Sequence, residues 1–141
     1  MILLDTNVIS ETMRKRCDEQ VLEWLDTVEK RDLLICTPVL AELYAGIGLQ
    51  KDQDQKDRLR YAVQRFTNSV LINPVVSFDA ACAQAYGEIV AKRTQLGRPI
   101  ASMDAQIAAV ADVSGASVAT RNVKDFEHLN LNMINPFEQT A

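Results

Sequence analysis

Three acidic residues have sequence neighbours that are unusual for a solvent-exposed carboxylate. Asp5 directly follows the apolar run Ile2-Leu3-Leu4, so it lies where a buried strand is expected to end. On a helix, Glu42 would have only small or apolar neighbours three and four positions away, and the same is true of Asp104. Because an ionised carboxylate is costly to bury alone, each of these groups is predicted to have a specific partner.

A divalent cation is the partner that would explain all three carboxylates together. Carboxylates that share a pocket repel one another unless they take up protons or hold a cation between them. Mg²⁺ and Mn²⁺ prefer oxygen ligands, whereas zinc favours His and Cys, and the chain has a single histidine, His128. A cation held in this way activates water and neutralises charge on a phosphoryl oxygen, which suits hydrolysis of a phosphodiester by one metal or by two. The shortage of histidine also argues against Ser-His-Asp and Cys-His nucleophiles.

Each carboxylate also has a simpler interpretation. Asp5 could cap the helix that follows it, and Glu42 could form a buried ion pair with a distant Arg or Lys. Asp112 has the same kind of neighbours as Asp104, but it lies near a helix end, where exposure to solvent is expected. His128 is expected to be a surface or packing residue.

Short apolar runs and helix-capping residues predict the elements that must position these side chains. Strands are expected at 2–4, 33–36, 70–72 and 117–120, where short apolar runs occur. Helices are expected at 7–16 with Asn7 as cap, at 18–28 with Asp18 as cap, at 37–48 from the Thr37-Pro38 start signal, at 51–66, from Ser77 or Asp79 to 95, and at 102–113 before Gly115. Strands that alternate with helices indicate an α/β fold with a mostly parallel central sheet. Ligands gather at the carboxyl ends of such strands, where Asp5 is expected to lie.

Composition limits the class of protein. The chain of 141 residues has the size of one domain, and 48% hydrophobic residues can form one core. We expect it to be folded as far as about Phe137. A net charge of -4 excludes a broad basic field, so any contact with nucleic acid must be local. Cys17, Cys36 and Cys82 have no metal-binding spacing and are expected to be reduced thiols in the cytosol. The chain shows no basic leader and no bilayer-spanning run, which favours a soluble intracellular protein.

Four segments, in order along nearly the whole chain, resemble motifs of PIN domains, and more narrowly of VapC-type toxins from bacterial toxin-antitoxin modules. They are Leu3-Leu4-Asp5-Thr6-Asn7-Val8-Ile9-Ser10, Thr37-Pro38-Val39-Leu40-Ala41-Glu42-Leu43-Tyr44-Ala45-Gly46, Asp104-Ala105-Gln106-Ile107-Ala108-Ala109 and Ala119-Thr120-Arg121-Asn122-Val123-Lys124-Asp125-Phe126. Each motif alone is weak, but four in the right order are specific.

This resemblance implies a single PIN-like domain over residues 1–141, in which three layers place helices on both sides of a mostly parallel sheet. It also implies a Mg²⁺- or Mn²⁺-dependent endoribonuclease in which Asp5, Glu42 and Asp104 are the metal-binding and catalytic set, with Thr6 as a supporting hydroxyl. Many relatives have Asp where this chain has Asn122. Asn122 is therefore expected to be a catalytic residue of the fourth motif and Asp125 a further metal ligand, although both could simply cap a short helical turn.

The same resemblance implies an RNA substrate, a cognate antitoxin that binds DNA and silences the enzyme, a homodimer, and a cytoplasmic location. Candidates for contact with the RNA backbone are Arg121, Lys124, Lys92, Arg93 and Arg98, although each could be ordinary solvated surface charge. Two other functions stay open. One is a catalytically inactive PIN-like binding module. The other is a haloacid-dehalogenase-like phosphatase, which would need a second Asp where Asn7 stands.

Overall fold

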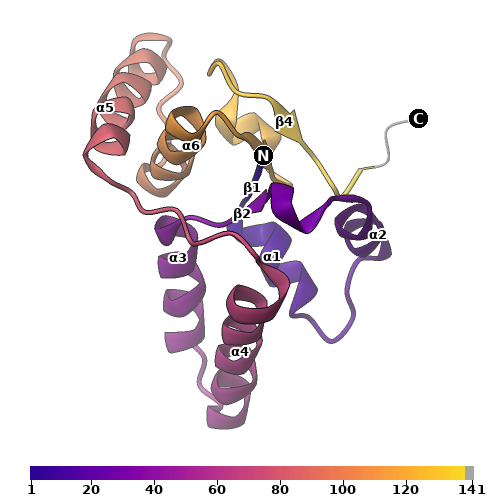
Figure 1. The fold of residues 1–141 in the computed structure, drawn as a ribbon. Coiled ribbons are helices and arrows are strands. Elements are labelled where there is room, and N and C mark those ends of the chain that lie inside the picture. Colours follow the sequence, from indigo (N-terminus) through magenta and orange to yellow (C-terminus); the bar gives the residue numbers. More distant parts are fainter. Residues whose placement is uncertain (139–141) are drawn as a thin grey trace.

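A four-stranded parallel sheet forms the centre of the molecule. The computed structural model describes residues 1–138. Its strands are β1 (Ile2–Leu4), β2 (Leu33–Leu34), β3 (Ser117–Ala119) and β4 (Met133–Ile134), in the order β2-β1-β3-β4, and every neighbouring pair is parallel. Six α-helices in this part of the chain flank the sheet (Figure 1), which confirms the predicted α/β fold.

Of the predicted capping residues, only Asp18 and Asp79 cap the helices of the described chain. The helices are α1 (Thr6–Thr12), α2 (Glu19–Thr27), α3 (Thr37–Gly48), α4 (Gln53–Arg65), α5 (Ala80–Gln95) and α6 (Ser102–Ser114). The side chains of Asp18, Asp52 and Asp79 accept hydrogen bonds from backbone N–H groups at the starts of α2, α4 and α5. Gly115 ends α6 in the left-handed conformation, with φ of 66°.

The capping of two helices differs from the prediction. The cap of α1 is Asp5 and not Asn7, and the helix ends at Thr12 instead of 16. Asp and Asn are both strong caps, so sequence alone could not choose between them. Helix α3 starts at Thr37-Pro38 as predicted, but the Thr37 hydroxyl accepts from the backbone N–H of Phe78 instead of capping its own helix.

The core lies around the two middle strands. Leu3, Leu4, Val118 and Ala119 are fully buried because β1 and β3 are covered on both faces. Helices α5 and α6 pack against each other (Figure 1), and α6 contributes a run of small buried residues that permits close packing. The core thereby holds the ends of β1, β3 and α6 in fixed relative positions.

The segment between α4 and α5 is where the predicted strands were wrong. Of the residues predicted as a strand at 70–72, Val70 ends a π-helical turn, η2 (Phe66–Val70), which continues α4, and the other two follow it. The segment reaches the sheet only through one parallel bridge, between Val76 and Cys36. The strand expected at 33–36 is correspondingly short, and β4 was not predicted.

Two short 3-10 helices complete the described chain, η1 (Lys30–Asp32) and η3 (Val123–Phe126). None of the helices within residues 1–138 is long and apolar enough to cross a membrane. The last three residues of the expected 1–141 domain, and most of the chain after Phe137, lie outside the described residues.

Candidate active site

The candidate site lies where the order of the sheet reverses. The chain passes from β1 to β2 on one side and later returns to β3 on the other side of β1. The crevice beyond the carboxyl ends of strands at such a reversal is the usual ligand site of open α/β sheets. Asp5 follows β1, and its backbone N–H donates to the carbonyl of Ala119 at the end of β3, at 2.9 Å.

The Asp5 carboxylate is almost completely buried, at 4% exposure, and is held by three donors. Oδ1 accepts from the backbone N–H of Thr6 at 2.7 Å, so Asp5 does cap α1. Oδ2 accepts from the Thr120 hydroxyl at 2.7 Å and from Nδ2 of Asn7 at 3.2 Å. Burial raises the pKa of Asp5, and these hydrogen bonds oppose that rise. The carboxylate is therefore fixed in direction but costly to ionise.

Thr120 is a site residue that the sequence analysis missed. It is fully buried at the end of β3, and its hydroxyl donates to Asp5 while it accepts from the backbone N–H of Asn122 at 3.0 Å and from Nδ2 of Asn7 at 3.3 Å. The signal was available, because Thr120 follows an apolar run just as Asp5 does. Thr120 links the first and fourth motifs.

Glu42 reaches the same place from α3. The Thr6 hydroxyl donates to Oε1 of Glu42 at 2.7 Å, so Thr6 joins Asp5 and Glu42 through its N–H and its hydroxyl. Among residues 1–138, this hydroxyl takes the place of the Arg or Lys partner considered from sequence. Glu42 is half-buried. Its helical neighbours Ala45 and Gly46 are exposed, so Glu42 lies at the edge of the buried face of α3 and not within it.

Asp104 stands in the first turn of α6 and is strongly perturbed. Its pKa is raised to about 6, first because the group is partly buried, and then because Asp5, Asp125 and Glu42 repel its charge, with Arg93 opposing them. The start of a helix normally favours a negative charge, so the other carboxylates and burial outweigh the helix dipole here. Three carboxylates from distant parts of the chain therefore act on Asp104.

The fourth motif forms the short helix η3 and its approach. Asn122 is exposed at the position before η3, and its side chain makes no capping hydrogen bond there. Asp125 is exposed within η3, and its charge raises the pKa of both Asp5 and Asp104. Electrostatically, Asp125 therefore belongs to the acidic cluster of Asp5, Glu42 and Asp104.

The donor chemistry of this acidic cluster fits a hard divalent cation. Within residues 1–138, no three His, Cys, Asp or Glu side chains are grouped closely enough to enclose one metal ion. Mg²⁺ does not require such a cage, since it commonly binds through one or two carboxylates and keeps several waters. An open set of carboxylate oxygens that repel one another fits Mg²⁺ or Mn²⁺ and not zinc.

The basic candidates separate into two groups. Lys92, Arg98, Arg121 and Lys124 are exposed, and Arg98 lies 4.0 Å from Glu127. The prediction that Arg93 faces RNA was wrong, because its side chain is buried and donates to backbone carbonyls. Asp112 and His128 are exposed, as expected, and all three cysteines are free.

Comparison with known sequences matches the chain to one family and to characterised relatives. The family model described as "PIN domain" matches residues 2–130. A plasmid stability protein, StbB, of Pseudomonas syringae pv. tomato is 43% identical over 98% of this chain and 99% of its own. Toxin FitB of Neisseria gonorrhoeae is 33% identical over 97% of this chain and 99% of its own. The VapC ribonuclease Y4jK of Sinorhizobium fredii is 33% identical over 98% of this chain and 99% of its own.

Two solved structures contain chains whose fold is similar to that of this chain. FitAB bound to an IR36 DNA fragment contains a chain with a TM-score of 0.91 and 31% identity, covering 100% of this chain and 99% of that one. VapBC2 from Rickettsia felis, bound to a DNA fragment from the promoter, contains a chain with a TM-score of 0.82 and 30% identity. The match covers 96% of this chain and 98% of that one. The fold and the arrangement of its elements are therefore shared over nearly the whole chain.

Proposed function

Because the chain belongs to the PIN-domain family, we propose that it is a metal-dependent endoribonuclease and the toxin of a toxin-antitoxin module. The names of its relatives support this, since they include a toxin and a VapC ribonuclease. The observation that carries the proposal is the convergence of Asp5, Glu42, Asp104 and Asp125 at the carboxyl end of the sheet, where burial first, and then the charges of the other three, raise the pKa of Asp104 to about 6. A cation offsets the repulsion between these charges.

Mg²⁺ or Mn²⁺ would be held by one or two of Asp5, Glu42, Asp104 and Asp125 directly, and by the others through its waters. When bound, the cation supplies charge neutralisation at the phosphoryl group and activation of water. Thr120, Asn7 and Thr6 fix the direction of the Asp5 carboxylate by the three hydrogen bonds described above. The Thr6 hydroxyl orients Glu42 in the same way. Asn122 borders the site as a neutral side chain that can hydrogen-bond to the RNA, which is the catalytic contribution proposed for it.

The position of Asn7 argues against a haloacid-dehalogenase-like phosphatase. That chemistry needs an acid-base carboxyl two residues after the nucleophilic Asp. Here the amide of Asn7 donates to Asp5 and Thr120, and its Oδ1 accepts from the backbone N–H of Arg121. Asn7 is therefore a structural hydrogen-bonding residue.

We further propose that a DNA-binding antitoxin is the partner of this chain, because its structural relatives are FitAB and VapBC2 bound to DNA. The cytoplasmic location proposed for it is supported by three free cysteines, which persist in a reducing compartment. The homodimer stays a prediction.

The metal requirement provides the test of the proposed function. With structured RNA as substrate, Mg²⁺ or Mn²⁺ is expected to support cleavage, and excess EDTA to lower the rate by at least about 100-fold, because the carboxylates alone cannot offset the charge of the phosphoryl group. Cleavage products are resolved on a denaturing gel, and activity should return when Mg²⁺ exceeds EDTA. RNA left intact with either metal would instead indicate an inactive binding module, which the neutral Asn122 makes the second candidate.

A further inference from the structure

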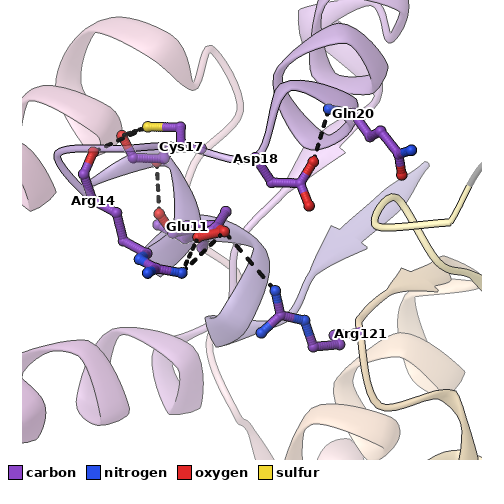
Figure 2. Close-up of polar contacts among 8 residues, drawn as sticks. Glu11, Arg14, Cys17, Asp18, Gln20 and Arg121 are labelled. Atoms are coloured by element: carbon purple, nitrogen blue, oxygen red, sulfur yellow. Dashed lines mark hydrogen bonds and ion pairs between the residues drawn. The ribbon is translucent and has the colours of Figure 1, made fainter.

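Glu11 is a buried carboxylate that lies outside the acidic cluster. It stands on α1 with 5% exposure, and its carboxylate lies between two arginines, as Figure 2 shows. Nη1 of Arg14 donates to it at 3.3 and 3.4 Å, and Nη2 of Arg121 lies 3.9 Å away. An apolar side chain would fill a buried position at lower free-energy cost. Stability alone therefore does not explain why a carboxylate stands here.

Arg121 is ordered by its neighbours and still open to a ligand. Its backbone N–H donates to Oδ1 of Asn7 at 3.1 Å, and its carbonyl accepts from Nδ2 of Asn135 at 3.4 Å. Its guanidinium lies over the ring of Phe137, 3.9 Å from the centroid, in a cation-π contact. The Arg121 side chain nevertheless remains 52% exposed. The guanidinium of Arg121 is therefore held in position while part of it stays accessible to a ligand.

This cation lies beside the acidic cluster. Arg121 comes between Thr120, which donates to Asp5, and Asn122. It lines a hollow of about 540 Å³ together with Lys124, Asp125 and Asn135. Four carboxylates and a net charge of -4 would repel a polyanion, so its approach to this site needs local positive charge. Arg121 and Lys124 supply that charge.

We propose that Arg121 binds a phosphate of the RNA at the acidic cluster, and that Glu11 and Phe137 are positioning residues that hold its guanidinium for this contact. The inference rests on the proposed ribonuclease function. A guanidinium suits a phosphate because its planar donors form two parallel hydrogen bonds with it. Stacking on Phe137 orders the plane and leaves N–H groups at its edge free for the ligand.

The test measures RNA binding and not cleavage. A fluorescently labelled single-stranded RNA is titrated with the Asp5→Asn protein in Mg²⁺ at several salt concentrations, and fluorescence anisotropy gives the Kd. Adding Arg121→Gln is expected to weaken binding about 5- to 10-fold and to reduce the slope of log Kd against log salt by about 0.7, the value for one lost phosphate contact on a single strand.

Arg14→Gln is the matched control, because it removes the same charge and the other partner of Glu11 from a side chain that is 64% exposed. It is expected to leave both Kd and slope near those of the Asp5→Asn parent. Phe137→Leu removes the ring on which the guanidinium stacks, and Arg121→Lys replaces the guanidinium by an ammonium group. Both variants keep the positive charge, so they should keep the salt slope and raise Kd about 3-fold. Thermal unfolding of each variant verifies that it is folded.

Two results would overturn the proposal. One is an unchanged salt slope in Arg121→Gln, and the other is an equal loss in Arg14→Gln, which would show a general charge effect. A gel of the RNA after each titration separates these results from failure of the ribonuclease assignment. RNA that is cut by the Asp5→Asn parent contradicts the assignment of the acidic cluster, and RNA left intact by the wild type in a parallel Mg²⁺ reaction contradicts the ribonuclease assignment. Cleavage by the wild type alone, together with an unchanged slope in Arg121→Gln, contradicts only the role of Arg121.

Discussion

Replacing Asp5 by asparagine is expected to lower the rate of RNA cleavage by about 10²- to 10³-fold or more, because a preorganised charge at a reacting phosphoryl group has effects of that size. Asp5 is the most buried member of the acidic cluster, and three donors fix its direction. An amide of the same shape would bind a divalent cation far more weakly than the carboxylate. Single-turnover cleavage of a labelled RNA in Mg²⁺ measures the loss.

The same change should leave the chain folded. Burial raises the pKa of Asp5 above that of the unfolded chain. A carboxyl group with a raised pKa in the folded state stabilises that state only at low pH, and this contribution is lost as pH rises through the folded pKa. At neutral pH the neutral amide therefore removes an unfavourable charge, which offsets the loss of the hydrogen bonds that its NH₂ group cannot accept. The free energy of unfolding without metal should change by about 1 kcal/mol or less.

Asp112→Asn is the matched control for Asp5→Asn. It makes the same chemical change at an exposed position on α6, and it should cleave RNA at the wild-type rate. Equal cleavage by the wild type and the Asp5→Asn variant would show that the measured activity comes from a contaminating nuclease.

Replacing Arg93 by methionine is expected to give the largest loss of stability among single changes near the site. Arg93 is 5% exposed, and its guanidinium donates to the carbonyl of Arg98 at 2.7 Å, of Asp125 at 2.8 Å and of Glu127 at 3.1 Å. Methionine fills similar space but leaves these carbonyls without their donor. The expected cost is about 3 kcal/mol, or a fall in Tm of roughly 10 °C in a chain of this size.

Lys92→Met provides the control for Arg93→Met, because Lys92 is the exposed neighbour on the same helix. Its effect on the free energy of unfolding should lie within about 0.5 kcal/mol. Urea unfolding followed by circular dichroism measures both variants. If the two cost the same, the bonds from Arg93 to η3 and to the turn after α5 do not stabilise the fold as described.

Local patterns were sufficient for much of the fold. The run before Asp5 predicted β1, and the caps Asp18 and Asp79 predicted the starts of α2 and α5. Each of these signals lies within a few residues of the element it defines. The prediction for 70–72 failed because Val70 belongs to a π-helical turn and Leu71 is buried directly after it, and a short apolar run alone does not distinguish this arrangement from a strand.

Contacts between distant residues account for what sequence could not predict. The hydrogen bond from Thr120 to Asp5 joins residues 115 positions apart. The bonds of Arg93 to η3 span more than 30 positions, so a charged residue on a helix was taken for a surface cation. β4 is only two residues long and carries no strand signal of its own, since pairing with β3 defines it.

The candidate site was predictable as a set of residues but not as a network. Asp5 stood out because it ends an apolar run, and Glu42 and Asp104 stood out because their helical neighbours are small or apolar. Their electrostatic interaction, in which Asp125 takes part, follows only from the folded arrangement. Their assignment as metal ligands stays a prediction.

Whether the acidic cluster binds a divalent cation can be tested with a crystal of the wild-type protein soaked in Mn²⁺. Diffraction is measured at a wavelength where manganese scatters anomalously. We expect an anomalous peak beside the Asp5 carboxylate, with oxygens of Asp104, Glu42 or Asp125 around the same ion or its waters. Strong manganese peaks only at other positions, with Asp5 bonded solely to Thr6, Asn7 and Thr120, would contradict it.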